Sequence, residues 1–189
     1  MSEKENLKIV AFVGMSGSGK SVAVDYLTAK GVPKVYFGGM IYKEMEKRGI
    51  VRTPESERDF REMIRETEGK DWVVRQVIDE VRNLADAGQK RIVLDGVYSW
   101  TEMKTLKHEF PGMLTFVAIV VPKKLRYKRV AARPDRPFSE EEIKERDRSE
   151  IENLEKGGPI AAADYYVLND GSVEQMEKKL GEILDEINF

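Results

Sequence analysis

The stretch GMSGSGKS, residues 14–21, follows directly after the apolar run IVAFV at residues 9–13. It fits the pattern G-x-x-x-x-G-K-[ST], in which a strand leads into a glycine-rich loop that opens a helix. Glycines in such a loop allow positive backbone φ angles, and the loop N–H groups together with the helix N-terminus face an anion. The stretch therefore predicts a phosphate-binding loop at the end of a strand. An ordinary glycine-rich turn is the alternative.

The residues of this loop suit a polyphosphate that binds together with a divalent cation. Lys20 is long enough to reach the β- and γ-phosphates of a nucleoside triphosphate, and the Ser21 hydroxyl can ligate Mg²⁺. An amphipathic helical pattern follows the loop and stops near Gly31. The predicted nucleotide-binding residues here are Gly14, Met15, Ser16, Gly17, Ser18, Gly19, Lys20, Ser21 and Val22.

Composition narrows the function classes. The chain has 189 residues with 32 basic and 34 acidic side chains, a formal net charge of −2. This balance produces no net attraction to nucleic acid or to a membrane surface, so we expect neither as a partner. The absence of cysteine excludes disulfides and thiolate chemistry and suits a reducing compartment. The charged N-terminus does not resemble a signal peptide, so we expect a cytoplasmic protein. The length of the chain predicts one domain, over residues 1–189.

Apolar runs that alternate with helical patterns indicate the fold class. These runs cover residues 8–13, 34–37, 91–95, 114–121 and 165–168. The run LTFVAIVV is apolar throughout, which is typical of a strand covered by helices on both faces. The alternation therefore predicts an α/β fold with a parallel sheet.

Several helices have recognisable start signals. Ser or Thr followed three residues later by Glu or Gln is typical of a capping box, and Pro favours the first helical position. The predicted helix starts are Thr53-Pro54, Ser99 with Glu102, Ser139 with Glu142, and Ser172 with Gln175. The sole histidine, His108, lies near the end of a helical pattern and is expected at the surface.

Two segments interrupt the simple alternation. Residues 38–90 hold three helical patterns where a single helix would complete a parallel crossover. Residues 126–158 are dense in charges of both signs. The functional interpretation of the second segment is a lid whose arginines close over a phosphate, and the alternative is a solvated helical hairpin. No Asn-Lys pair occurs, so the guanine-binding motif N-K-x-D is absent from the sequence. A small kinase remains the favoured class.

The ordered set of motifs resembles the superfamily of nucleoside monophosphate kinases and dephospho-coenzyme A kinases. Similarity is greatest to uncharacterised archaeal and bacterial P-loop kinase-like proteins. The matching segments are GMSGSGKS (14–21), FGGMIYKEMEKRG (37–49), RIVLDGVYS (91–99), RYKRVAARPDRPFSEEEIKERD (126–147) and ADYYVLNDGS (163–172). The resemblance implies a three-layer P-loop fold with a five-stranded parallel sheet of order 2-3-1-4-5. It also implies a helical acceptor-binding insertion at about residues 38–90 and a helical lid at about residues 126–158.

This resemblance also implies a reaction and roles for single residues. The γ-phosphoryl group of Mg-ATP would move to a small acceptor, such as a nucleotide or a dephospho-coenzyme A-like compound. The implied catalytic residues are Lys20, Asp95, Arg133 and Arg136, with Arg146 as a weaker lid candidate, and the implied metal ligands are Ser21 and Asp95. Arg129, Asn169 and Gly171 would contribute to nucleotide binding, and Gly39, Tyr42 and Tyr98 to acceptor binding.

Each of these roles has a structural alternative. Asp95 can cap a turn, any of the arginines can be an ordinary surface residue, and Asn169 can form an Asx turn. The two segments that contain Tyr42 and Tyr98 lack the arginines that many superfamily members carry there, and these tyrosines can stack on a flat acceptor or pack the insertion. This difference motivates a second hypothesis, a nucleotide-binding switch or slow ATPase that acts on a protein partner. The oligomeric state, monomer or weak dimer, stays open.

Overall fold

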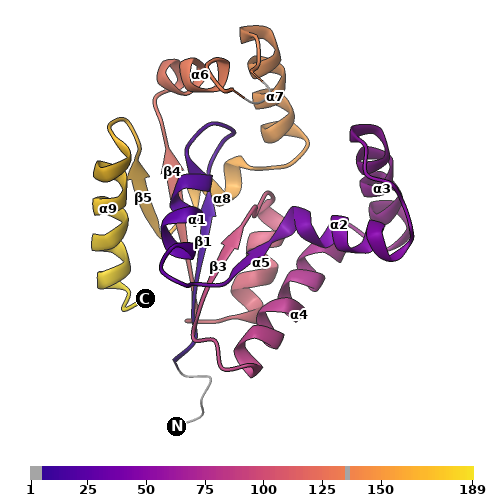
Figure 1. The fold of residues 1–189 in the computed structure, drawn as a ribbon, viewed down its shortest axis with the longest axis horizontal. Coiled ribbons are helices and arrows are strands. Elements are labelled where there is room, and N and C mark those ends of the chain that lie inside the picture. Colours follow the sequence, from indigo (N-terminus) through magenta and orange to yellow (C-terminus); the bar gives the residue numbers. More distant parts are fainter. Residues whose placement is uncertain (1–5, 135–136) are drawn as a thin grey trace.

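The computed structural model describes residues 6–134 and 137–189, and its centre is one parallel sheet. The strand order is β2-β3-β1-β4-β5, and Figure 1 shows β5, β4, β1 and β3 side by side. The strands are β1 (Lys8–Val13), β2 (Lys34–Tyr36), β3 (Arg91–Asp95), β4 (Leu114–Val120) and β5 (Tyr165–Leu168). All four neighbouring pairs are parallel. The predicted α/β class and the strand order are therefore confirmed.

Helices connect the strands and cover both faces of the sheet (Figure 1). They are α1 (Lys20–Thr28), α2 (Phe37–Lys47), α3 (Pro54–Thr67), α4 (Trp72–Asp86), α5 (Trp100–Glu109), α6 (Lys123–Ala131), α7 (Glu140–Glu152), α8 (Gly157–Ala161) and α9 (Val173–Glu186). Within the described residues, none of these helices is long and apolar enough to cross a membrane.

The alternation of side chains along β1 divides the core into two clusters. Ile9, Ala11 and Val13 pack on one face against α2, α4 and α5, which we call the α4 face. Val10 and Phe12 point to the opposite face, against α1 and α9, which we call the α1 face. β1 is buried on both sides, and the loop that follows it lies at the upper end of the sheet in Figure 1, below α6.

Two strand ends differ from the prediction by one residue each, since β4 ends at Val120 instead of residue 121 and β2 ends before Phe37. Phe37 was expected at the end of the second strand but is the first residue of α2. The edge strand β2 pairs only with β3, and its last partner is Asp95, where β3 ends. Beyond that point the backbone has no neighbour to pair with, so it turns into a helix while the Phe37 ring stays buried.

The three predicted capping boxes are present, and the predicted start at Thr53-Pro54 also forms a capping box, with Ser56. Reciprocal side-chain and backbone hydrogen bonds join Thr53 with Ser56, Ser99 with Glu102, Ser139 with Glu142, and Ser172 with Gln175. These bonds satisfy N–H groups that would otherwise lack partners in the first helical turn. They fix the starts of α3, α5, α7 and α9.

The two interrupting segments are helical. Residues 38–90 contain nearly all of α2 and the whole of α3 and α4, which confirms the three predicted helical patterns. Helices α6 and α7 lie beyond the carboxyl ends of the strands, above the loop after β1 (Figure 1). The charged segment is thus placed over the edge of the sheet where ligands of open α/β proteins bind.

Candidate functional site

The loop between β1 and α1 is packed too tightly for side chains at its glycines. Gly17 has φ +83°, and a Cβ there would collide with Val130 of α6. Gly19 has φ +100°, and a Cβ there would collide with the Asn169 amide. The sequence predicts glycine at these positions because of the backbone conformation. In addition, α6 and the loop after β5 leave no room for a larger residue.

Lys20 lies folded over the loop that precedes it. Its Nζ donates hydrogen bonds to the carbonyl oxygens of Gly14 at 2.8 Å and Met15 at 3.0 Å. Burial, followed by the nearby charge of Lys156, lowers the pKa of Lys20 to about 8, while Glu150 and Asp95 act in the opposite direction. A buried ammonium held only by neutral carbonyls gains from the arrival of an anion.

The start of α1 is open to a ligand. Gly19 is its N-cap residue, and among the described residues no side chain caps this helix, in contrast to α3, α5, α7 and α9. The N–H groups of the first turn therefore still need an acceptor. A phosphate oxygen at this position would supply it.

Ser18 serves the loop itself. Its N–H donates to Met15 O at 3.1 Å, and its carbonyl oxygen accepts from Asn169 Nδ2 at 2.9 Å. Its hydroxyl is buried and has no hydrogen-bond partner in the described part of the chain. Among the predicted phosphate-binding residues, Ser18 thus has its hydroxyl and its backbone N–H and carbonyl groups directed into the protein.

Asp95 lies at the end of β3, beside the loop. In the sheet register it is opposite Phe12 of β1 and Tyr36 of β2. Burial raises the pKa of Asp95, and the charges of Lys34 and Lys20 partly oppose this shift. With the exposed Ser21 at the start of α1, Asp95 offers hard oxygen donors of the type that Mg²⁺ takes in addition to water and phosphate. The two residues therefore fit a Mg²⁺ ion.

Tyr36 and Tyr98 lie within electrostatic reach of Asp95. The Tyr36 and Tyr42 rings lie 6.3 Å apart at 57°, and burial raises the pKa of both Tyr36 and Tyr98. Tyr42 also packs inside the insertion, where its ring lies 3.6 Å from the Arg52 guanidinium. Gly39 faces Tyr36, since a Cβ on Gly39 would approach that ring to 3.3 Å.

The predicted lid arginines fall into different environments. Arg129 Nη1 donates to Asn169 O at 2.8 Å and Arg129 Nη2 to Gly171 O at 3.2 Å, so this side chain joins α6 to the loop after β5. Arg133 is exposed and close enough to help lower the pKa of Lys20. Arg136 lies outside the described residues.

Glu150 and Arg126 contact the loop but are not among the residues predicted from the sequence. Glu150 Oε2 of α7 accepts from Ser16 N–H at 2.9 Å, and Lys156 Nζ lies 2.8 Å from the same carboxylate. Arg126 of α6 donates to Ser16 O at 3.0 Å and forms a two-pronged ion pair with Asp147 of α7. Charged residues crowd this segment, so composition could not single these out.

One signal in α7 could have found this face. Ile143 is buried, and Asp147 and Glu150 follow it at spacings of four and seven residues, on the same side of the helix. Ile151, four residues after Asp147, is exposed and obscures the pattern.

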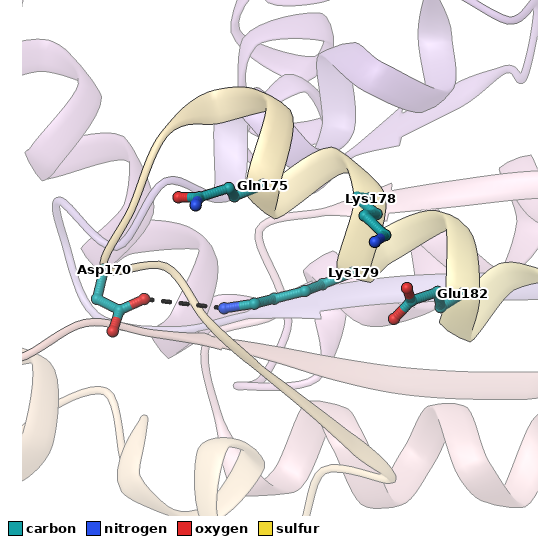
Figure 2. A pocket seen from close by; sticks show the side chains of 5 residues that line it. All are labelled: Asp170, Gln175, Lys178, Lys179 and Glu182. Atoms are coloured by element: carbon teal, nitrogen blue, oxygen red, sulfur yellow. Dashed lines mark ion pairs between the residues drawn. The ribbon is translucent and has the colours of Figure 1, made fainter.

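A hollow of about 340 Å³ lies away from the loop, against α9. Figure 2 shows its lining side chains, which are Asp170, Gln175, Lys178, Lys179 and Glu182. Asp170 and Lys179 form an ion pair at 3.8 Å. Because charges of both signs pair within it, this hollow offers no uniform binding surface for an anion or a cation.

The loop after the central strand, the strand order and the helical layers define a P-loop protein with a kinase-like fold. Two solved structures share it. Shikimate kinase from Bacteroides thetaiotaomicron has a TM-score of 0.60 at 11% identity, covering 96% of this chain and 99% of its own. A gluconokinase from Sinorhizobium meliloti has a TM-score of 0.56 at 16% identity, covering 96% of each chain.

Sequence relatives define the family. The sequence profile of the AAA domain matches residues 10–153. A UPF0200 protein of Thermococcus onnurineus is 35% identical over 182 residues, covering 95% of this chain and 97% of the relative. One from Sulfurisphaera tokodaii is 34% identical over 186 residues, covering 96% of this chain and 98% of the relative. The chain belongs to the UPF0200 family, and the predicted resemblance to archaeal P-loop kinase-like proteins is confirmed.

Proposed function

We propose that the protein is an ATP-dependent phosphotransferase that moves the γ-phosphoryl group of Mg-ATP to a small-molecule acceptor. The observation that carries this proposal is the placement of Lys20 at the carboxyl end of the central strand, folded onto Gly14 O and Met15 O and within the electrostatic reach of Asp95. The kinase-like fold supports it, because the names of the structural relatives describe kinases of small molecules.

The reaction assigns a step to each group. An acceptor hydroxyl oxygen attacks the γ-phosphorus, the bond to the bridging oxygen of the β-phosphate breaks, and ADP leaves. The hydroxyl proton passes to Asp95, whose burial makes it a stronger proton acceptor than an exposed carboxylate. Lys20 and Arg133 stabilise the charge on the migrating group, and we assign Arg136 the same role.

The cation has a supporting part. Ser21 and Asp95 would hold Mg²⁺, and the ion, when bound, supplies positive charge that shields the phosphates from the attacking oxygen. Because a carboxylate has two oxygens, Asp95 can bind the metal ion, accept the proton of the acceptor hydroxyl, or do both.

The remaining assignments follow the placement of the elements in one domain. We propose that residues 38–90 bind the acceptor through Gly39, Tyr42 and the neighbouring Tyr98, and that residues 126–158 form the lid. Arg129 contributes to nucleotide binding by holding the carbonyl groups of Asn169 and Gly171, in the loop after β5, in place. That loop already contacts the phosphate-binding loop through Asn169.

A nucleotide-binding switch or slow ATPase is the second candidate. The observation that favours it is the direct hydrogen bond between the loop and α7, since a ligand that enters the loop would alter the position of this helix. A partner protein could then sense the change.

The first test is ADP production by the pure protein with Mg-ATP, alone and with candidate acceptors. The panel contains nucleoside monophosphates, nucleosides, dephospho-coenzyme A, shikimate and gluconate. Strong stimulation by one compound supports the phosphotransferase and names its acceptor. Slow ADP release that no acceptor changes favours the switch.

Two variants separate nucleotide binding from transfer. Lys20→Ala should abolish ATP binding or turnover under either candidate, so unchanged affinity and turnover would refute the nucleotide site. Arg133→Ala should reduce phosphoryl transfer by about 100-fold while ATP affinity changes by less than about threefold, because the guanidinium acts on transition-state charge. Arg148→Ala, an exposed arginine of α7, is the matched control.

A further inference from the structure

A buried carboxylate of α7 reaches the phosphate-binding loop. Glu150 Oε2 accepts a hydrogen bond from Ser16 N–H at 2.9 Å, although the two residues are 134 positions apart. Glu150 is only 2% exposed. A carboxylate that has lost its water must be paired with donors or cations, so the neighbours of Glu150 decide what this contact does.

Two cations complete the surroundings of this carboxylate. Lys156 Nζ lies 2.8 Å from Glu150 Oε1, and Arg146 Nε lies 3.4 Å from the same oxygen. Lys156 is 4% exposed, so the pair is shielded from water. A loop N–H, an ammonium and a guanidinium are the donors with which proteins bind phosphate groups. The Glu150 carboxylate thus occupies an anion site that the loop and α7 build together.

We propose that this anion site receives a phosphate of the nucleotide, and that the Glu150 carboxylate fills it while the protein is nucleotide-free. When the nucleotide binds, its phosphate accepts the Ser16 N–H, the Glu150 side chain turns away, and Lys156 and Arg146 contact the phosphate. The inference rests on the proposed function, since it requires a nucleotide in the loop. It adds Lys156 as a phosphate-binding residue and Glu150 as an internal competitor.

Lys156 has contacts that hold it in place without the Glu150 side chain. Its Nζ lies 4.6 Å from the centre of the Tyr98 ring, and its backbone N–H donates to Glu150 O at 3.0 Å. The charge of Lys156 also helps to lower the pKa of Lys20. Two neighbouring ammonium groups gain more from a phosphate than from one carboxylate, because the phosphate carries more negative charge.

A permanent ion pair is the competing explanation. In that case Glu150 and Lys156 only fasten α7 to the loop, and removing either partner leaves the other buried and unpaired. The two explanations predict opposite effects of a neutral residue at position 150 on ligand affinity. If Glu150 only holds α7 against the loop, a neutral residue at this position weakens ligand binding. If Glu150 competes with the ligand, a neutral residue strengthens ligand binding.

The experiment measures the affinity of the full chain for Mg-ATP and for inorganic tripolyphosphate by isothermal titration calorimetry at pH 7. Glu150→Gln should bind both probes about tenfold more tightly, because a larger fraction of the protein then has a free anion site. Lys156→Gln should bind both about tenfold more weakly, because one charged ligand is lost. Glu152→Gln, on the exposed side of the same helix, is the matched control and should match the wild type.

A double variant covers the case in which Glu150→Gln does not fold. Glu150→Gln/Lys156→Gln leaves no buried charge unpaired within this pair, and it should bind tripolyphosphate more tightly than Lys156→Gln alone. Near-UV circular dichroism verifies the fold of each variant. Equal affinity of the double variant and Lys156→Gln, or a folded Glu150→Gln that binds no more tightly than the wild type, overturns the inference.

The result also separates this inference from the proposed function. If the wild type and Glu150→Gln both fail to bind either probe, the nucleotide site itself is wrong and the inference falls with it. If the wild type binds, Lys20→Ala does not, and Glu150→Gln shows no gain, only the inference is wrong.

Discussion

At the scale of single residues, the site is defined by charges that are buried next to backbone groups. Lys20 is held by two carbonyl oxygens, and Glu150 is held by a backbone N–H and Lys156. Each of these groups has lost water and has only a few partners, so its protonation and its contacts respond strongly to a new charge. Residue-scale predictions therefore concern pH and close contacts.

Nucleotide affinity should fall as pH rises from 7 to 9. With a pKa of about 8, Lys20 is mostly charged at pH 7 and mostly neutral at pH 9. A bound phosphate favours the charged form and raises this pKa, so binding at pH 9 takes up a proton, and the affinity should be about tenfold weaker than at pH 7. Calorimetry in two buffers of different ionisation enthalpy measures the uptake. Lys20→Arg does not titrate in this range, so an equal pH dependence in that variant would contradict the assignment.

Gly17→Ala should be much more destabilising than Gly31→Ala. Both glycines have nearly the same φ, +83° and +84°, so the backbone strain of an alanine is similar, about 1–2 kcal/mol. Only at Gly17 does the new Cβ also collide with Val130, while nothing lies within 4 Å at Gly31. Urea denaturation compares the two free energies of unfolding. Equal losses would show that α6 does not press on the loop in solution.

At the scale of elements, the site depends on how helix starts and helix contacts place the functional groups. The box at the start of α5 also holds the segment before it, since Glu102 Oε2 accepts from Tyr98 N–H at 2.7 Å and from Ser99 N–H at 3.0 Å. Helices α6 and α7 are joined by Arg126 and Asp147, and Arg126 continues to Ser16 O. These contacts connect the charged segment 126–158 to the loop and fix the backbone at Tyr98 before α5.

Loss of the α5 cap should affect both stability and the acceptor side. Ser99→Ala removes the hydroxyl that accepts from Glu102 N–H and should cost about 1 kcal/mol of unfolding free energy. Ser172→Ala removes the equivalent cap of α9 and should cost a similar amount. Because only α5 carries the Tyr98 segment, Ser99→Ala alone should lower acceptor-stimulated ADP production. Equal acceptor-stimulated ADP production by both variants would show that Tyr98 does not take part in acceptor binding.

At the scale of the whole molecule, one sheet separates two hydrophobic clusters. Phe116 is buried in the cluster on the α4 face and Phe12 in the cluster on the α1 face. Both clusters are built on the same central strands, so the loss of one should weaken the other. This arrangement predicts that the chain unfolds as a single cooperative unit.

Damage to one face should therefore lower the melting temperature of the other. Phe12→Ala and Phe116→Ala should each cost about 3–5 kcal/mol through lost burial and a new cavity. Trp72 and α5, which carries Trp100, pack on the α4 face, so fluorescence monitors that face while far-UV circular dichroism monitors all helices. In Phe12→Ala both signals should shift together. Two separate transitions would show independent units, and the exposed Val51→Ala should change neither.

The loop, the parallel sheet and the starts of four helices can be predicted from the amino-acid sequence alone. These features depend on neighbouring residues: glycines at fixed spacing, a buried apolar run such as LTFVAIVV, and a Ser or Thr three positions before its capping partner. The role of Asp95 is implied by the family resemblance, and the sheet register places this residue at the end of β3, opposite Phe12.

The identity of the charges that meet at the loop depends on how the helices pack in three dimensions. Glu150, Lys156 and Arg126 are ordinary members of a charge-rich segment until α6 and α7 fold over the carboxyl ends of the strands. The same packing also directs Arg129 to backbone carbonyls and turns the Ser18 hydroxyl inward. Contacts between residues more than a hundred positions apart depend on the packing of whole elements, and the spacing of charged side chains can indicate a helix face but does not identify its partners.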